Sequence, residues 1–246
     1  MRFLVMHKLG PAEPATFAPP PAELIKNMGS LVGEVMKKGA MENGAGLNPK
    51  FPRTRLTSRG EQILEEHGPL LGTNELLAHV AMVKVNSKSE AIDIGRRYVK
   101  AVGADVTLEI GRVTEPWDIG MAPAPTTSVP ESYLLLHMAD ARSEAGTAPS
   151  ADEAARVGAL MADLSAKKTL TMPLEHVRPS REGRRLKFKA GKRLSVSDGP
   201  FAETKELISG FCLLNLPSLD EVLSFATRYG EILGDLEVDV LGVNER

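Results

Sequence analysis

Apolar and polar positions follow the same order in the two halves of the chain. A short apolar strand is predicted at residues 3–7 and again at residues 133–138. Apolar side chains then recur every three or four positions within residues 21–38 and 150–168, which predicts one amphipathic helix in each half. The two halves therefore begin with the same strand and helix.

The remainder of each half also follows one pattern. Alternation on either side of Ala190-Gly191 predicts a β-hairpin over residues 184–197, whereas the matching part of the first half has a weaker signal. A central strand, a helix and a last strand follow. Capping boxes, in which a Ser and a Glu three positions later satisfy the backbone donors of a first helical turn, begin three helices, at Ser87, Ser150 and Ser218. The central strands are expected at residues 76–85 and 207–216.

An ungapped internal repeat explains this common order. Shifting the chain by 131 positions aligns His67 with Asp198 and continues to Val99 and Gly230, with Tyr98 identical to Tyr229. We therefore predict two copies of one unit. Their expected ranges are residues 1–120 for the first repeat, 121–131 for a Pro-rich linker and 132–246 for the second repeat.

The order of strand, helix, hairpin, strand, helix and strand predicts a ferredoxin-like, split βαβ unit in the α+β class. Such a unit has helices on one face of its sheet and leaves an apolar face to be covered. We expect the two repeats to pack sheet to sheet as a dimeric α+β barrel within one chain, a pseudo-dimer. A ligand cavity is expected at or beside that junction.

Composition narrows the possible partners of the protein. Of the 246 residues, 42% are hydrophobic and 4% aromatic, and the net charge is -2. A near-neutral charge and few aromatic side chains argue against nucleic-acid binding, and no apolar run is long enough to span a membrane. The single cysteine, Cys212, excludes an intrachain disulfide, so we expect a cytoplasmic protein. Further homo-oligomerisation stays open.

The string DGPFAETKELISGF at residues 198–211, with ADARSEAG at 139–146, closely resembles the YCII-related proteins, and in particular the branch named for its DGPF motif. The resemblance implies a ferredoxin-like unit that forms a dimeric α+β barrel, here as a tandem duplication. Some relatives are small-molecule lyases that use a His and Asp pair. The histidine of that pair lies on the first helix in those relatives, whereas neither 21–38 nor 150–168 of this chain contains a histidine, so the chain departs from the pair at this position.

Four residues are candidates for catalysis. His7 and His137 end matching apolar strands and suit a general base, although each could simply hydrogen-bond locally. Asp198 could orient a histidine or act as an acid, or it could cap the turn before Gly-Pro. Glu206 matches Glu75 of the first copy, and both are secondary carboxylates or partners of nearby Lys and Arg.

The candidate binding residues are Glu75, His67, His79 and Glu175. His67 and His79 have no counterpart in the second copy, so the two copies are not expected to form equivalent sites. His176 follows Glu175 in an expected loop and is interpreted as a surface residue. Cys212 lies in a buried strand, where a thiol usually behaves as a small inert hydrophobe.

Two functions fit these residues. The first is a small-molecule-binding protein that acts as a cofactor-independent acid/base lyase or isomerase. The second is a non-catalytic ligand-binding or regulatory module, in which the histidines are incidental. No phosphate-binding loop, dinucleotide fingerprint, metal-ligand spacing or nucleophile elbow is present, so no cofactor and no metal are expected.

Overall fold

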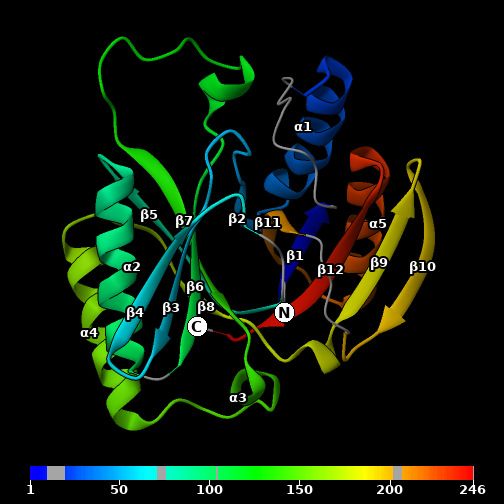
Figure 1. Cartoon of the computed structure of the whole chain (residues 1–246). Helices are drawn as coiled ribbons and strands as arrows, with labels where there is room; N and C mark the ends of the chain where they lie inside the picture. Colours follow the sequence, from blue (N-terminus) through cyan, green and yellow to red (C-terminus); the bar gives the residue numbers. More distant parts are fainter. Residues whose placement is uncertain (10–19, 71–75, 104, 202–206, 246) are drawn as a thin grey trace. The chain divides into compact units, whose positions relative to one another are not determined.

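The α+β chain forms two compact units in its computed structural model (Figure 1). The structure describes residues 1–9, 20–70, 76–103, 105–201 and 207–245. Unit 1 takes its described residues from Met1–Gly46 and Val177–Arg246, and unit 2 takes them from Leu47–Leu70 and Leu76–His176. Within the described ranges, no helix is long and apolar enough to cross a membrane.

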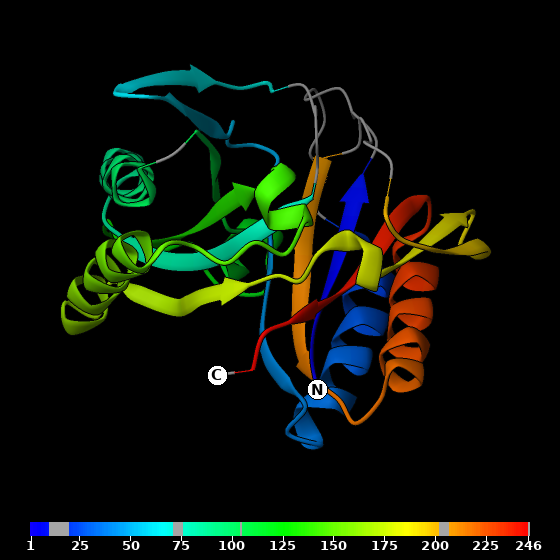
Figure 2. The same cartoon turned by 90° about the horizontal axis from the view of Figure 1, so that it is seen from below.

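Unit 1 is a six-stranded antiparallel sheet with two long helices, which lie side by side on one face of the sheet (Figure 2). The strands run in the order β10-β9-β12-β1-β11-β2. They are β1 (Arg2–Leu9), β2 (Met41–Gly46), β9 (Arg184–Lys189), β10 (Lys192–Asp198), β11 (Leu207–Asn215) and β12 (Leu236–Val243). The helices are α1 (Ala22–Lys37), α5 (Leu219–Leu233) and the short η2 (Ser180–Glu182). Apolar residues of α1 and α5, such as Leu31 and Phe225, pack on Val5 and its neighbours to form the core.

Unit 2 has the same kind of sheet, in the order β4-β3-β6-β7-β5-β8. Its strands are β3 (Thr54–Arg59), β4 (Gln62–His67), β5 (Leu77–Val85), β6 (Val106–Arg112), β7 (Glu131–Met138) and β8 (Leu170–His176). Its helices are α2 (Lys88–Val102), α3 (Ala141–Glu144), α4 (Ala151–Ala166) and η1 (Pro116–Ile119). The core of this unit joins α2 and α4 to the sheet through residues such as Val99, Leu164 and Leu135.

Both units contain a ferredoxin-like arrangement, as predicted. In unit 1, β11 lies between β1 and β2, and β12 lies on the other side of β1, which is the strand order of a split βαβ pair. In unit 2, β6, β7, β5 and β8 repeat that order. A hairpin, β9-β10 or β3-β4, extends one edge of each sheet. The packing of one sheet on the other stays a prediction.

The compact units differ from the predicted division at residues 121–131, because each unit takes elements from both halves of the chain. The segment β1-α1-β2 of the first half pairs with β11 and β12 of the second half. In turn, β7-α4-β8 of the second half joins β5 and β6 of the first. The predicted linker therefore connects β6 to β7, which are neighbouring strands of one sheet.

Local signals in the sequence located the helices better than the edge strands. The Oγ atoms of Ser87, Ser150 and Ser218 each accept a hydrogen bond from the backbone N–H three residues later, as the capping boxes predict. The edge strands β2 and β8 were not predicted. β2 reads MENGAG and β8 contains Pro173, and such residues are depleted in strands except at sheet edges.

Cleavage of the chain within residues 121–131 is expected to leave both units folded, because each unit contains strands from both fragments. A protease site inserted there should yield two fragments that elute together in size-exclusion chromatography and separate only in denaturant. A fragment of residues 132–246 expressed alone lacks β1 and β5, the strands that complete its two sheets. A stable monomer of that fragment, measured by light scattering and circular dichroism, would contradict the observed pairing.

Candidate functional site

Three histidines lie side by side on neighbouring strands of unit 2. In the register of the sheet, His79 on β5 is opposite His137 on β7 and also opposite His176 on β8. The rings of His79 and His137 are 4.8 Å apart between centroids, and those of His79 and His176 are 4.6 Å apart and perpendicular. Antiparallel pairing thus forms a histidine row from residues that are 39 to 97 positions apart in sequence, within the ordinary reach of cross-strand neighbours.

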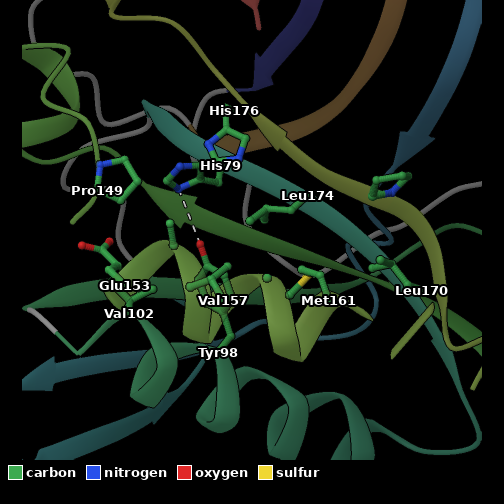
Figure 3. A pocket seen from close by; sticks show the side chains of 13 residues that line it. His79, Tyr98, Val102, Pro149, Glu153, Val157, Met161, Leu170, Leu174 and His176 are labelled. Carbon is green, nitrogen blue, oxygen red and sulfur yellow. Dashed lines mark hydrogen bonds between the residues drawn. The ribbon is translucent and has the colours of Figure 1, made fainter. Parts of the chain in front are cut away.

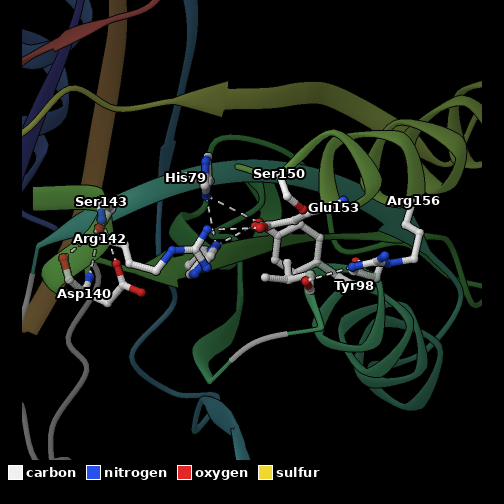
Figure 4. A network of polar contacts seen from close by, with 11 residues as sticks. His79, Tyr98, Asp140, Arg142, Ser143, Ser150, Glu153 and Arg156 are labelled. Carbon is white, nitrogen blue, oxygen red and sulfur yellow. Dashed lines mark hydrogen bonds and ion pairs between the residues drawn. The ribbon is translucent and has the colours of Figure 1, made fainter. Parts of the chain in front are cut away.

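Tyr98 of α2 contacts the histidine row from the helical layer. Its Oη lies 2.8 Å from Nδ1 of His137 and 3.5 Å from Nδ1 of His79. The two histidine Nδ1 atoms lie 2.9 Å apart. Figure 4 shows this network together with the polar side chains beside it. Tyr98 and His137 are buried, so their polar atoms satisfy one another inside the unit.

The contact between the two Nδ1 atoms constrains the protonation of His79 and His137. A hydrogen bond between two imidazole nitrogens needs one protonated and one unprotonated nitrogen, so the pair shares one proton at these two atoms. When His79 carries that proton, its Nε2 is an acceptor in the neutral ring. When His137 carries it, Nε2 of neutral His79 becomes a donor. The tautomer of the pair therefore decides whether Nε2 of His79 accepts a hydrogen bond from a ligand or donates one to it.

Burial keeps His79 and His137 neutral near pH 7, and partial desolvation also lowers the pKa of the more exposed His176. Loss of hydration lowers the pKa of His137 from 6.5 to about 4. Burial, with the neighbouring His137 and His176, holds the pKa of His79 far below its ordinary value. Burial also lowers the pKa of His176, although the nearby Glu175 opposes that change. Neutral imidazoles serve both as hydrogen-bond partners and as proton acceptors.

Two members of the histidine row, His79 and His176, form the polar end of a cavity of about 310 Å³ between α2, α4, β5 and β8 (Figure 3). His79, His176 and Tyr98 face the cavity, whereas His137 lies behind them and does not line it. The remaining walls are largely apolar, and their side chains come mainly from α4 and β8. The apolar lining residues are Val102, Pro149, Ala154, Val157, Met161, Leu170, Pro173 and Leu174. Cavities with apolar walls and a few convergent polar groups are the usual form of small-molecule sites.

Glu153, in the first turn of α4, is the charged side chain of this cavity. Its carboxylate accepts a hydrogen bond from the Arg142 guanidinium at 3.1 Å, and its backbone N–H donates to Ser150. Its negative charge also acts on the histidine row, because it opposes the lowering of the pKa of His137. The residue whose backbone N–H is capped by Ser150 at the start of α4 is thus also part of the site.

Unit 1 contains the tyrosine–histidine pair but not the histidine row. Tyr229 of α5 lies 2.8 Å from Nδ1 of His7 on β1, as Tyr98 does from His137. The positions opposite His7 are occupied by Gly210 on β11 and then Gly46 on β2. A Cβ atom at Gly210 would lie 2.6 Å from Cε1 of His7 and 2.7 Å from a backbone oxygen. A histidine does not fit there, and the two units are not equivalent, as predicted.

Asp198 lies in a different setting from the predicted role beside a histidine. Its carboxylate is exposed and pairs with Nε of Arg184 at 2.8 Å. The following Gly199 is packed so closely that a Cβ atom would overlap the Ser180 carbonyl. The ring of Phe201 stacks under the Arg185 guanidinium at 4.4 Å. The DGPF segment therefore makes structural contacts within unit 1.

The other predicted residues are placed apart from the cavity or lie outside the described residues. His67 is exposed at the end of β4, where it contacts Glu65 and Thr54. Glu175 is buried on β8, next to His176 along the strand. Glu75 and Glu206 lie outside the described residues. Of the candidates chosen from the sequence, His79 and His137 are the ones that the structure brings together.

Sequence reasoning missed Tyr98, Glu153 and His176 as site residues. Tyr98 was visible as an identity with Tyr229 in the repeat, and Glu153 as part of a capping box. His176 was assigned to a surface loop; it is exposed, as predicted, but it ends strand β8 and lines the cavity instead of lying in a loop. Within the ranges that the structure describes, no three His, Cys, Asp or Glu side chains are placed to hold a metal ion.

Comparisons with known proteins find similarity over part of the chain. The profile of the YCII-related domain matches residues 132–235, which run from β7 to the end of α5 and contribute to both units. Over 54 residues, the chain is 46% identical to an uncharacterized protein of Rhizobium meliloti (strain 1021), a match over 22% of this chain. The match covers 43% of that relative's length. No solved structure matches the chain.

Acidification is expected to destabilise the protein through its buried histidines. Burial lowers the pKa of His7 and of His137 from 6.5 to about 4, so between these values the unfolded chain binds more protons than the folded one. The stability that is present above pH 6.5 is therefore lost as the pH falls towards 4. As the pH falls from about 7 to about 5, proton uptake at each of these two histidines in the unfolded chain should lower the free energy of unfolding by about 1–2 kcal/mol.

Urea denaturation at several pH values measures this dependence. His137→Asn removes one titrating group, so the free energy of unfolding of the variant should fall less steeply with acidification, whatever its value at neutral pH. An unchanged pH slope in both His137→Asn and His7→Asn would show that these two side chains do not carry the effect.

Proposed function

We propose that unit 2 binds a small organic molecule in its histidine-lined cavity and transfers protons with His79 and His176, as a cofactor-independent lyase or isomerase. The observation that carries this proposal is the row of neutral imidazoles at the polar end of an otherwise apolar cavity. Proton abstraction next to a carbonyl group, elimination and isomerisation need only placed acids and bases.

The geometry supports His79 and His176 as the catalytic residues. Both rings line the cavity, and among the described residues neither Nε2 of His79 nor either ring nitrogen of His176 has a hydrogen-bond partner. Their neutral state near pH 7 leaves a lone pair on each ring to accept a substrate proton. General acid–base catalysis of this kind contributes about 10²- to 10⁴-fold to a rate.

His137 and Tyr98 are positioning residues in this proposal. They contact Nδ1 of His79 from behind the cavity, so they hold the ring and select its tautomer. A proton accepted at Nε2 of His79 is accommodated when the shared proton resides on Nδ1 of His79 and donates to His137. Glu153 stabilises the cation that forms, because its carboxylate lies at the same end of the cavity.

A non-catalytic ligand-binding module is the second candidate. It is favoured by the strongly lowered pKa of His79, since a general base works best when its pKa is near the operating pH. In that case the same nitrogens would only accept or donate hydrogen bonds to a ligand. The two candidates share the cavity and differ in whether a proton is transferred.

Replacement of the cavity histidines tests the catalytic candidate. Deuterium uptake from heavy water into acetophenone, 1-indanone and cyclohexanone, followed by NMR, reports proton abstraction next to a carbonyl group. If the protein accelerates uptake by any of these ketones, His176→Asn and His79→Asn should each lower the rate by about 10²-fold or more.

His7→Asn is the matched control, because His7 makes the same tyrosine contact in unit 1 without the neighbouring histidines. Its uptake rate should equal that of the unmodified chain. Binding of the ketones without accelerated uptake would support the non-catalytic module instead. An equal loss of rate in His7→Asn and His79→Asn would contradict a site in unit 2.

Filling the cavity from α4 is expected to abolish activity without unfolding the protein. Gly158 lines the cavity, and a Cβ atom there would meet nothing within 4 Å. Gly158→Leu should therefore place its side chain in the cavity and also stabilise α4 by about 0.5–1 kcal/mol, since glycine is a poor helix former. Gly29→Leu on α1 is the matched control, because a Cβ atom at that position is also in open space.

Thermal unfolding should show stabilisation in both variants, whereas deuterium uptake should fall only in Gly158→Leu. Full activity in a folded Gly158→Leu variant would place the reaction elsewhere in the protein.

A further inference from the structure

The charges around the cavity of unit 2 restrict its ligand more narrowly than the proposed function does. Glu153 is the one acidic side chain among the thirteen lining residues, and none of them is a lysine or an arginine. Burial keeps His79 neutral near pH 7, and partial desolvation favours the neutral form of the more exposed His176. An anionic ligand would therefore lose its hydration, gain no cation within the cavity and lie near a carboxylate.

The charges around the cavity do not favour a cationic ligand either. The carboxylate of Glu153 already accepts a hydrogen bond from Arg142 at 3.1 Å, so its charge is partly compensated by the protein. Asp140 and Glu153 raise the pKa of the neighbouring His137 whereas Arg142 lowers it, so charges of both signs lie near the histidine row. An added ammonium group would be repelled by the arginine that it would have to replace.

The hydrogen-bonding groups at the polar end fit a ligand hydroxyl. Nδ1 of His79 is committed to His137, while its Nε2 and the nitrogens of His176 have no partner among the described residues. Each neutral imidazole offers one acceptor nitrogen, and the tautomer of the His79–His137 pair sets whether Nε2 of His79 accepts or donates. A hydroxyl group both donates and accepts, so it matches either state.

The dimensions of the cavity fit one substituted ring. Its volume is about 310 Å³. An apolar cavity of about 150 Å³ in a protein core suffices to hold benzene. The side chains of Val157, Met161, Leu170 and Leu174 supply an apolar surface on the walls away from the histidines. A ring with one small substituent therefore fits between α4 and β8 with its polar group towards His79 and His176.

We infer that the substrate class of this site is an uncharged molecule about the size of one ring, with a single hydroxyl group, a phenol or an enol, directed at His79 and His176. This inference rests on the proposed function, because it assigns a ligand to the same cavity. Beyond the proposed function, it specifies that the ligand is uncharged and that its polar group is a hydroxyl. It also accounts for the two imidazoles at the polar end of a cavity whose described lining residues include no lysine or arginine.

Four probes that share one aromatic ring separate the contributions of ligand charge and of the hydroxyl group to binding. They are p-cresol with a hydroxyl group, benzoate as an anion, benzylamine as a cation and toluene without a polar group. Binding to the full chain near pH 7 is followed by NMR through the imidazole resonances of His79 and His176, assigned with the His79→Asn and His176→Asn variants. We expect p-cresol to bind at least about tenfold more tightly than benzoate or benzylamine, and several-fold more tightly than toluene.

Variants of His176 and His7 distinguish a failure of the inferred ligand class from a failure of the proposed function. His176→Asn should weaken the binding of p-cresol and leave the binding of toluene nearly unchanged. His7→Asn should change the affinity for neither probe. Benzoate or benzylamine binding as tightly as p-cresol at these resonances would overturn the inferred ligand class and leave the cavity as a binding site. Toluene binding as tightly as p-cresol would overturn the role of the hydroxyl group. If no probe shifts these resonances, both the ligand class and the proposed function fail.

Discussion

The candidate site depends on the pairing of β5 between β7 and β8. That pairing puts His79 opposite His137 on one side and opposite His176 on the other. Because a one-residue shift of register moves every side chain to the other face of a sheet, the row exists only in this register. The apolar side chains that follow on β5, such as Ala81 and Val83, pack in the core and hold the register in place.

Desolvation gives this row its chemical character. A solvated histidine is partly protonated near neutral pH, but water is largely excluded from His79 and His137, and the charged state is disfavoured. Their short Nδ1 contact is compatible with neutral rings, since two imidazolium ions would repel each other there. Tyr98 completes the arrangement with a buried hydroxyl, and burial raises its pKa far above the ordinary value, so it remains neutral as well.

The two units share the tyrosine–histidine contact but differ in the residues next to it. The contact of Tyr229 with His7 repeats that of Tyr98 with His137, so the strand end and the helix meet in the same way in each unit. The difference lies in the neighbouring strands, where glycines in unit 1 replace the histidines of unit 2. Close backbone packing around Gly210 leaves no room for a side chain. The tyrosine–histidine pair is thus common to both units, whereas, in the part of the chain that the structure describes, the histidine row is present in unit 2 alone.

The sequence by itself determined the local elements and their repetition. Helix starts at Ser87, Ser150 and Ser218, the central strands and the ferredoxin-like order follow from short-range patterns, because capping and hydrophobic periodicity act within a few residues. His79 and His137 were candidates for a related reason, since a polar residue in an apolar strand is conspicuous in the sequence itself.

Only the tertiary structure decided which strands pair and which side chains meet. Each sheet takes strands from both halves of the chain, and no local signal specifies that exchange, because strand pairing depends on long-range contacts. From the sequence, therefore, His176 was interpreted as a loop residue, Glu153 as part of a helix cap and Tyr98 as a repeated position. Their joint placement around one cavity follows from pairing and packing across segments that are far apart in sequence.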